Sequence, residues 1–164
     1  MLNFFVTGGA GFIGSNFICR SLELLDCRII NIDKLTYSGN LDNLNHLSDN
    51  PNYNFHQVDI NDFDVIKSLL NKYNPDAVIN FAAESHVDRS IDSPSLFVET
   101  NILGTQNLLD ATLDYWKNGN KDFKFIHIST DEVYGSLGDG GLFTEETAYS
   151  PSSPYSASKA SSDH

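Results

Sequence analysis

Polar side chains in the last third of the sequence have the types and spacing of a proton-transfer site. Thr130, Asp131 and Glu132 follow an apolar run, and Tyr155 precedes Lys159 by four residues. Successive residues of an extended strand point to opposite sides, so two adjacent carboxyl groups at a strand end can reach different atoms of one substrate. A tyrosine and a lysine four residues apart share a helix face, where the ammonium favours the phenolate. Together these residues offer an acid, two bases and a hydrogen-bond donor.

A glycine-rich segment near the amino terminus has the spacing of a nucleotide-binding turn. It reads Val6-Thr-Gly-Gly-Ala-Gly-Phe-Ile-Gly14 and lies between an apolar run and a helical pattern. Glycine at positions Gly8, Gly11 and Gly14 permits a tight turn and brings backbone N–H groups close to a pyrophosphate. A strand-to-helix turn without a ligand is the plainer alternative, but the flanking elements and a later acidic residue favour a dinucleotide.

That acidic residue is Asp33, at the end of the second apolar run. Its carboxylate would accept hydrogen bonds from a ribose 2′-hydroxyl and repel a 2′-phosphate, so the sequence favours NAD over NADP, although Lys34 beside it weakens that preference. Asp59 and Ile60 end the third run and would flank the adenine, although for these two a purely structural role is equally compatible. The residues that end the fourth run, where a dinucleotide must pass, are Phe81, Ala82 and Ala83.

The acidic pair changes the chemistry that the tyrosine alone would predict. A free phenol has a pKa of about 10, so Tyr155 needs Lys159 and a cationic nicotinamide to stabilise its anion. It would then take a proton from a sugar hydroxyl as hydride leaves the same carbon for NAD, which is the chemistry of a dehydrogenase or an epimerase. Beside the resulting 4-keto group, one carboxylate can remove the C5 proton while a carboxylic acid protonates the hydroxyl leaving C6. Hydride returned to C6 gives a 4-keto-6-deoxy sugar, with Thr130 hydrogen-bonded to the C4 oxygen.

Spacing alone leaves plainer interpretations of both motifs open. Asp131 and Glu132 are equally compatible with the solvated start of a loop, and Tyr155 with Lys159 is equally compatible with a surface pair on a helix. Their joint occurrence behind a nucleotide-binding motif favours the catalytic interpretation.

Short apolar runs alternate with longer helical patterns along the chain. The runs predicted as strands are Leu2–Thr7, Arg28–Ile32, Asn54–Val58, Ala77–Phe81 and Phe123–Ile128. The predicted helices lie near Phe12–Leu25, Asp62–Tyr73 and Ser95–Trp116, and a further one begins after Ser153-Pro154. Right-handed crossovers between such elements build an α/β fold, a doubly wound, Rossmann-like parallel sheet covered on both faces. Between them, Lys34–Tyr53 is predicted to be a loop with a short helical piece, and Gly135–Ser153 a second long loop.

The amino-acid composition limits the classes of partner that the protein is expected to bind. The 164 residues suit one ordinary domain, and ten basic against twenty-two acidic side chains give a formal net charge of -12. That charge argues against nucleic acid and against an anionic membrane surface. No apolar stretch reaches membrane length and no basic leader precedes the first run, so we expect a cytoplasmic protein. The five histidines and two cysteines lack metal-ligand spacing, and no metal is predicted.

The motifs carry a resemblance over essentially the whole chain. The sequence resembles the extended short-chain dehydrogenase/reductase superfamily and, within it, the dTDP-glucose 4,6-dehydratases. The glycine-rich and Tyr-Lys segments are typical of the superfamily, whereas the block from Asp33 to Asn40 and the Thr130-Asp131-Glu132 triplet are more specific. The remaining matching segments are Ala82–Ser90 and Ser129–Gly135.

The resemblance implies a role for each matching residue. Asp131 would be the acid, Glu132 the C5 base and Tyr155 the base for the first oxidation, while Ser85 and Thr130 would contact the sugar nucleotide. Residues implied to contact NAD are Phe12, Ile13, Asp33, Lys34, Leu35, Thr36, Asp59, Ile60, Ala82, Ala83, Thr100, Tyr155 and Lys159. Ser85 also borders the expected cofactor site. The implied activity is conversion of dTDP-glucose to its 4-keto-6-deoxy form, by a homodimer.

Length is the departure from that family. Family members continue well past position 164, so we expect residues 1–164 to be an NAD-binding Rossmann-like domain, cut after the fifth strand and within the next helix, with the substrate-binding portion absent. Three alternatives stay open at this stage: a UDP-glucose 4,6-dehydratase, a truncated non-catalytic NAD-binding module, and an unfolded remnant. The apolar stripe on the helix Ser95–Trp116 is compatible both with the subunit contact of such a dimer and with ordinary core packing.

Overall fold

The computed structural model describes residues 1–119, 122–138 and 140–164. These residues divide into two compact units. The first, called the sheet unit below, comprises Met1–Ala82 and Asn107–Ile128. The second, called the helical unit, comprises Ala83–Gln106 and Ser129–His164.

The sheet unit contains five parallel strands in the order β3-β2-β1-β4-β5. Their bounds are β1 Leu2–Thr7, β2 Cys27–Asp33, β3 Tyr53–Gln57, β4 Ala77–Asn80 and β5 Lys124–His127. Each lies within a residue or two of its predicted range, and the predicted doubly wound parallel sheet is confirmed. The order reverses between β1 and β4, which is the place where open sheets of this kind bind ligands, beyond the carboxyl ends of the strands.

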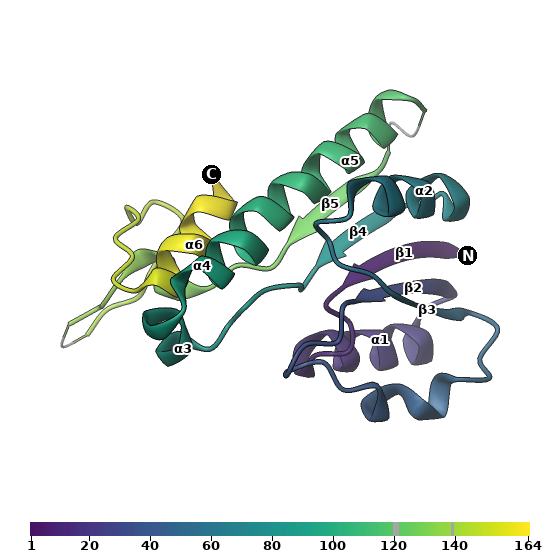
Figure 1. Ribbon diagram of the computed structural model, residues 1–164, viewed down its shortest axis with the longest axis horizontal. Coiled ribbons are helices and arrows are strands. Elements are labelled where there is room, and N and C mark those ends of the chain that lie inside the picture. Colours follow the sequence, from purple (N-terminus) through teal and green to yellow (C-terminus); the bar gives the residue numbers. More distant parts are fainter. Residues whose placement is uncertain (120–121, 139) are drawn as a thin grey trace. The chain divides into compact units, whose positions relative to one another are not determined.

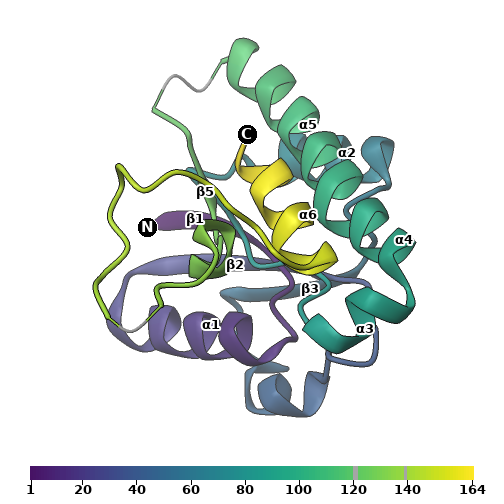
Figure 2. The same ribbon diagram turned by 90° about the vertical axis from the view of Figure 1, so that its left-hand side faces the viewer.

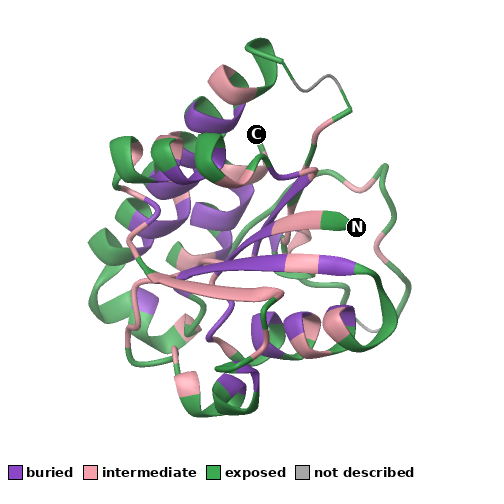
Figure 3. Ribbon diagram, turned by 90° about the vertical axis from the view of Figure 1, so that its right-hand side faces the viewer, coloured by how far each residue is buried: buried purple, intermediate pink, exposed green. Residues whose placement is uncertain are grey.

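Helices cover both faces of this sheet (Figure 1). One face carries α1 (Phe12–Leu24) and a 3-10 turn (Leu41–Leu47), and the other carries α2 (Phe63–Tyr73) and most of α5 (Thr105–Lys117). Alternate residues of β1 serve the two cores: Phe5 packs on the α2 side and Val6 on the α1 side. Figure 3 shows the resulting burial of the central strands in purple, with edge strand β3 only partly buried.

The helical unit is built around α6 (Pro154–Asp163), which begins at a capping box in which the Ser153 and Ser156 side chains satisfy each other's backbone N–H groups. This start agrees with the prediction. Figure 2 shows α6 beside α3 (Val87–Asp92) and α4 (Pro94–Phe97). The unit also contains a 3-10 turn, Asp131–Tyr134.

Two predictions for the helices need correction. The single helix predicted over Ser95–Trp116 is interrupted, because α4 passes into a wider π-helical turn, Val98–Gly104, before α5 begins. Such turns often mark functional sites, and this one buries Thr100 and Asn101 inside the helical unit. Helix α3 was not predicted, because its six residues, with only Val87 and Ile91 apolar, are too few to show a helical period.

Candidate active site

The glycine-rich loop of the sheet unit requires glycine for steric reasons. Gly8 has a positive φ of 68°, and a Cβ added there would lie 2.6 Å from the backbone nitrogen of Ala82. A Cβ at Gly14 would overlap the carbonyl oxygen of Gly8, which itself accepts a hydrogen bond from the Gly11 N–H. The strand, the loop and the first turn of α1 therefore approach more closely than any side chain would allow.

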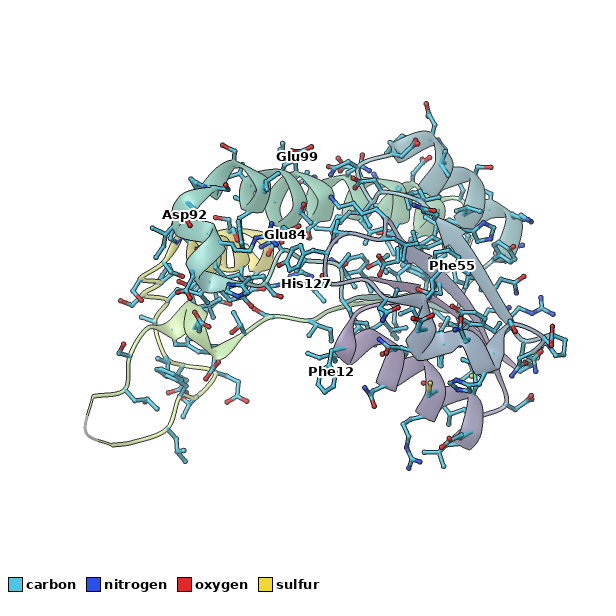
Figure 4. The ribbon with its side chains drawn as sticks, turned by 60° about the horizontal axis from the view of Figure 1, so that its bottom comes forward. Phe12, Phe55, Glu84, Asp92, Glu99 and His127 are labelled. Carbon is cyan, nitrogen blue, oxygen red and sulfur yellow. The ribbon has the colours of Figure 1, made fainter. Side chains whose placement is uncertain are left out.

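The amino terminus of α1 is suited to bind an anion. Gly11 is the N-cap and offers no side chain to cap the helix, and the first turn holds no acidic residue. The first backbone N–H groups of a helix lack intrahelical partners and carry partial positive charge. Phe12 and Ile13, which begin the helix, are 83% and 61% exposed, and Figure 4 shows Phe12 projecting outward. A pyrophosphate is the ligand that this arrangement fits.

The carboxylate of Asp33 is fixed by backbone donors. Its Oδ2 accepts a hydrogen bond from the Ala10 N–H at 2.9 Å and its Oδ1 one from the Leu35 N–H at 2.8 Å. Leu35 has a positive φ of 59°, an uncommon conformation for leucine. Asp33 is thus a fixed acceptor next to the glycine-rich loop, as a ribose hydroxyl requires. Thr36 follows in the same segment, where its carbonyl oxygen accepts a hydrogen bond from the Gly39 N–H.

Lys34, which weakened the preference for NAD in the sequence, has a carboxylate partner. Its Nζ lies 3.2 Å from Oδ2 of Asp59. Burial alone would raise the pKa of Asp59, but hydrogen bonds from Asn61 and the charge of Lys34 outweigh it and lower that pKa. The ion pair directs the ammonium to Asp59, beside buried Ile60. A 2′-phosphate would have to compete with that carboxylate, so the geometry favours NAD more strongly than the sequence does.

In the helical unit, the catalytic triplet lies on a turn and not on an extended strand. The Thr130 hydroxyl accepts a hydrogen bond from the Glu132 N–H at 3.3 Å and caps the 3-10 turn Asp131–Tyr134. We expected the alternation of a strand to point the two carboxyl groups in different directions. That expectation is wrong, because Asp131 and Glu132 lie on a 3-10 turn. Asp131 and Glu132 are nevertheless both exposed, because they occupy the first turn beyond the cap.

Tyr155 is close enough to this triplet to interact with all three of its members. Its pKa is raised above the ordinary value, first by burial and then by the negative charges of Glu132 and Asp131, while a hydrogen bond with Thr130 lowers it. Its ring packs edge-on against the buried ring of Phe97, with centroids 6.3 Å apart. Residues twenty-five positions apart in the sequence are thus brought together, as the catalytic interpretation requires.

Lys159 is almost wholly buried, with 3% of its surface exposed. Burial lowers its pKa to about 8, while the charge of Asp163 raises it. The sequence predicted that this ammonium, together with a cationic nicotinamide, would favour the Tyr155 phenolate, whereas the protein's own groups raise the pKa of Tyr155. The physical reason is that burial and two carboxylates outweigh every other influence of the protein on the phenol.

The other predicted contact residues are distributed over both units. Phe81 and Ala82 end the sheet unit's first segment, where the Phe81 ring packs on Phe17 with centroids 5.3 Å apart. Ala83, exposed Ser85 and buried Thr100 belong to the helical unit.

Asn101 was not singled out in the sequence, although it is 1% exposed and holds three segments of the helical unit together. Its Oδ1 accepts from the Glu84 N–H at 2.8 Å. Its Nδ2 donates to the Glu84 carbonyl and to the Ser158 hydroxyl, each at 2.9 Å. It thereby ties the turn bearing Thr100 to the segment bearing Ser85 and to α6. A polar pair inside an otherwise apolar helical pattern was the available signal.

Within the described part of the chain, no group of three or more histidine, cysteine or acidic side chains is arranged to hold a metal ion. None of the helices described there is long and apolar enough to cross a membrane.

Comparison with known proteins identifies the family. Residues 5–164 match the family described as GDP-mannose 4,6 dehydratase. The chain belongs to this family. A dTDP-glucose 4,6-dehydratase from Xanthomonas campestris pv. campestris is 54% identical over 168 residues, which are 100% of this chain and 48% of that relative. The chain spans about half the length of the curated relatives it matches.

Solved structures agree with the family assignment. A dTDP-glucose 4,6-dehydratase from Streptomyces venezuelae, solved with NAD bound, has a TM-score of 0.90 and 44% identity, covering 99% of this chain and 49% of that one. A UDP-glucose 4-epimerase from Thermotoga maritima, solved with UDP-glucose, has a TM-score of 0.85 and 33% identity, covering 99% and 49%. The backbone of this chain is therefore similar to those of dehydratases and epimerases alike.

Proposed function

We propose that this chain is the NAD-binding and acid–base portion of a dTDP-glucose 4,6-dehydratase. The observation that carries the proposal is the interaction of Tyr155 with Thr130, Asp131 and Glu132 inside one compact unit. An oxidation base with two carboxyls beside it suits a reaction that oxidises one carbon and then eliminates water next to it. The identity to dTDP-glucose 4,6-dehydratases supports the choice of substrate.

NAD is the cofactor that the sheet unit fits. The close approach at Gly8, the uncapped start of α1 and the fixed carboxylate of Asp33 suit a pyrophosphate and a ribose diol. Bound NAD would supply the chemistry of accepting hydride from C4 of the sugar and giving it to C6. The proposed contacts in this unit are Gly8, Gly11, Phe12, Ile13, Gly14, Asp33, Lys34, Leu35, Thr36, Asp59, Ile60, Phe81 and Ala82.

For the oxidation, Tyr155 takes the proton of the C4 hydroxyl. The protein's own groups raise the pKa of the phenol, so its deprotonation depends on a positive charge arriving with the cofactor. Lys159, on the same helix face, supplies a second positive charge as long as it is protonated. Thr130 donates to the C4 oxygen, and Ala83, Ser85 and Thr100 complete the contacts in the helical unit.

For the dehydration, Glu132 removes the C5 proton and Asp131 protonates the hydroxyl that leaves C6. The 4-keto group makes the C5 proton acidic enough for a carboxylate base. The step requires an acid and a base, so Asp131 carries a proton and Glu132 does not when water leaves. An epimerase has no need for such a pair, which is why the dehydratase is preferred over the 4-epimerase of similar backbone.

The assignment of the two steps can be tested with Asp131→Asn in the full-length protein. We expect dTDP-glucose to reduce bound NAD at a rate near that of the unchanged protein, so that the absorbance of reduced nicotinamide accumulates, while formation of 4-keto-6-deoxy product falls by about 10²-fold or more. Asp92→Asn, an exposed carboxylate of the same unit, is the matched control. Loss of nicotinamide reduction together with product would contradict the roles given to Asp131 and Tyr155.

The nucleotide base and the oligomeric state are further parts of the proposal. Competition between dTDP-glucose and UDP-glucose at equal concentration distinguishes the proposed substrate from the nearest rival. We also propose that the full-length protein is a homodimer, because Leu109, Leu113 and Trp116 of α5 are exposed apolar side chains along one helix. Light scattering of Leu113→Asp should then give a lower mass than the unchanged protein.

A further inference from the structure

The carboxylate of Asp163 connects three segments of the helical unit. Its Oδ2 accepts a hydrogen bond from the Ser129 hydroxyl at 2.6 Å and another from the Tyr149 hydroxyl at 3.1 Å. Ser129 directly precedes the triplet that begins at Thr130, and Tyr149 lies near the end of the long loop. One oxygen atom of α6 is thus bonded to the start of the acid–base turn and to the loop.

Asp163 also lies one helical turn beyond Lys159 on α6, so both side chains are on one face. Its charge raises the pKa of Lys159 against the effect of burial. The other titratable side chains around Asp163 are Tyr149, which donates to it, and the two rings packed on Tyr149, those of Tyr134 and His164. The Tyr149 ring packs at a tilt against His164, with centroids 5.0 Å apart, and meets Tyr134 edge-on at 5.3 Å. The groups that act on Tyr155 come from the 3-10 turn: Thr130, Asp131 and Glu132.

We propose that Asp163 is a positioning residue of this active site: through Ser129 it holds the start of the catalytic triplet against α6, and one helical turn beyond Lys159 it places a carboxylate on the same helix face as that ammonium. The inference rests on the proposed function for its catalytic consequences, but its effect on Lys159 does not depend on the substrate. Asp163 is not among the cofactor and substrate contacts proposed above, and it acts through Ser129 and Lys159.

The two roles of Asp163 affect different steps. The hydrogen bond to Ser129 places the turn with Asp131 and Glu132, so its loss slows dehydration. The charge affects Lys159, whose ammonium assists the Tyr155 base, so removal of the charge weakens oxidation as the pH rises. Asp163→Asn removes the charge and leaves a carbonyl oxygen that still accepts from Ser129. Ser129→Ala removes the hydrogen bond and leaves the charge.

The experiment compares these variants in the full-length protein, with Asp92→Asn as a control for net charge. Lysine labelled with carbon-13 at Cε allows the titration of Lys159 to be followed by NMR, with Lys159→Arg to assign the signal. In Asp163→Asn we expect the pKa of Lys159 to fall by about one unit or more, and the basic limb of the kcat/KM profile for dTDP-glucose to move down with it. In Ser129→Ala we expect the pKa of Lys159 and the basic limb of the kcat/KM profile to be unchanged. The rate of dehydration, measured after C4 oxidation, should fall by about tenfold.

The outcomes separate the two proposals. If Lys159 in a folded Asp163→Asn titrates as in the unchanged protein, the inference about Asp163 is overturned. If Lys159 responds as expected but the unchanged protein does not convert dTDP-glucose, the proposed function fails and the charge role of Asp163 stands. Should Asp163→Asn fail to fold, the double variant Ser129→Ala, Tyr149→Phe keeps the carboxylate but loses both hydrogen bonds, and unaltered dehydration in it would equally overturn the inference.

Discussion

The sheet unit and the helical unit hold their proposed functional residues by different interactions. In the sheet unit, backbone geometry determines the proposed NAD site. Its features are Gly8 with a positive φ, the uncapped start of α1, and the carboxylate of Asp33 bound by two backbone N–H groups. An apolar core lies on each face of the sheet that carries them. In the helical unit, the buried apolar residues are few, namely Phe97, Val133 and Ala160. Its buried polar residues are more numerous: Glu84, Ser90, Thr100, Asn101, Thr105, Ser156, Ser158 and Lys159. A site held by hydrogen bonds and buried charge depends on pH and on single atoms more than one held by backbone packing.

The largest expected effect is in the helical unit. Tyr155→Phe removes the oxidation base and should lower kcat for dTDP-glucose by about 10²- to 10⁴-fold. The affinity for NAD, measured by calorimetry, should fall by no more than about tenfold, because the substitution removes one hydroxyl among many proposed NAD contacts. Tyr73→Phe, on α2 of the sheet unit, is the matched control and should leave kcat near its original value. A Tyr155→Phe protein with substantial turnover would remove the tyrosine from the mechanism.

Buried charge in the helical unit should make stability depend on pH. Because the pKa of Lys159 is lowered from 10.5 to about 8, the cost of burying its charge is fully present below pH 8 and is relieved as the pH rises from 8 toward 10.5. Lys159→Met should therefore raise the free energy of unfolding at pH 7 by up to about 3 kcal/mol while abolishing turnover. Urea unfolding of both proteins from pH 6 to 11 tests this, and an advantage of the methionine variant that does not shrink above pH 8 would contradict it.

A single methyl group added at Gly8 of the sheet unit should destabilise the protein. Gly8→Ala meets both a positive φ and backbone atoms of Phe81 and Ala82, and should cost roughly 2–4 kcal/mol of stability and weaken NAD binding. Gly138→Ala has the same φ of 68° with nothing within 4 Å, so it should cost only about 1 kcal/mol. The difference in unfolding free energy between the two variants measures the cost of steric overlap with Phe81 and Ala82, because both positions have the same φ. Equal losses would mean that the close approach to Ala82 is unimportant.

The smallest expected effect concerns cofactor choice. Asp59→Asn releases Lys34 from its ion pair and Asp33→Asn removes the charge that repels a 2′-phosphate. Each should shift the ratio of NADP to NAD affinity toward NADP by roughly tenfold, whereas exposed Asp49→Asn should shift it little. Fluorescence titration with both dinucleotides measures the ratio. No shift in either variant would exclude the acceptor role of Asp33.

Much of the sheet unit could be predicted from the sequence because its signals are local. An apolar run such as Leu2–Thr7 and a glycine spacing specify a strand and a turn without reference to distant residues. Tyr155, Lys159 and the triplet could be named from their spacing. The hydrogen bonds that hold the helical unit together could not be predicted. Asn101, for example, bonds to Ser158 fifty-seven residues away, and such contacts leave no periodic pattern in the sequence.

The direction of the Tyr155 pKa could not be predicted for the same reason. The spacing to Lys159 was visible in the sequence, but the burial of the phenol and the approach of Asp131 and Glu132 depend on how the unit folds. The role of Asp163 had a weak local signal in its four-residue spacing from Lys159. Its bonds to Ser129 and Tyr149 had none.

The central claim is that one site oxidises C4, eliminates water and reduces C6 of the same sugar. The most direct measurement supplies the full-length protein and NAD with dTDP-glucose carrying deuterium on C4, in ordinary water. We predict a 4-keto-6-deoxy product with that deuterium on C6 and a solvent hydrogen on C5. Deuterium retained on C4, in recovered glucose or in its 4-epimer, with no 6-deoxy product would contradict the account.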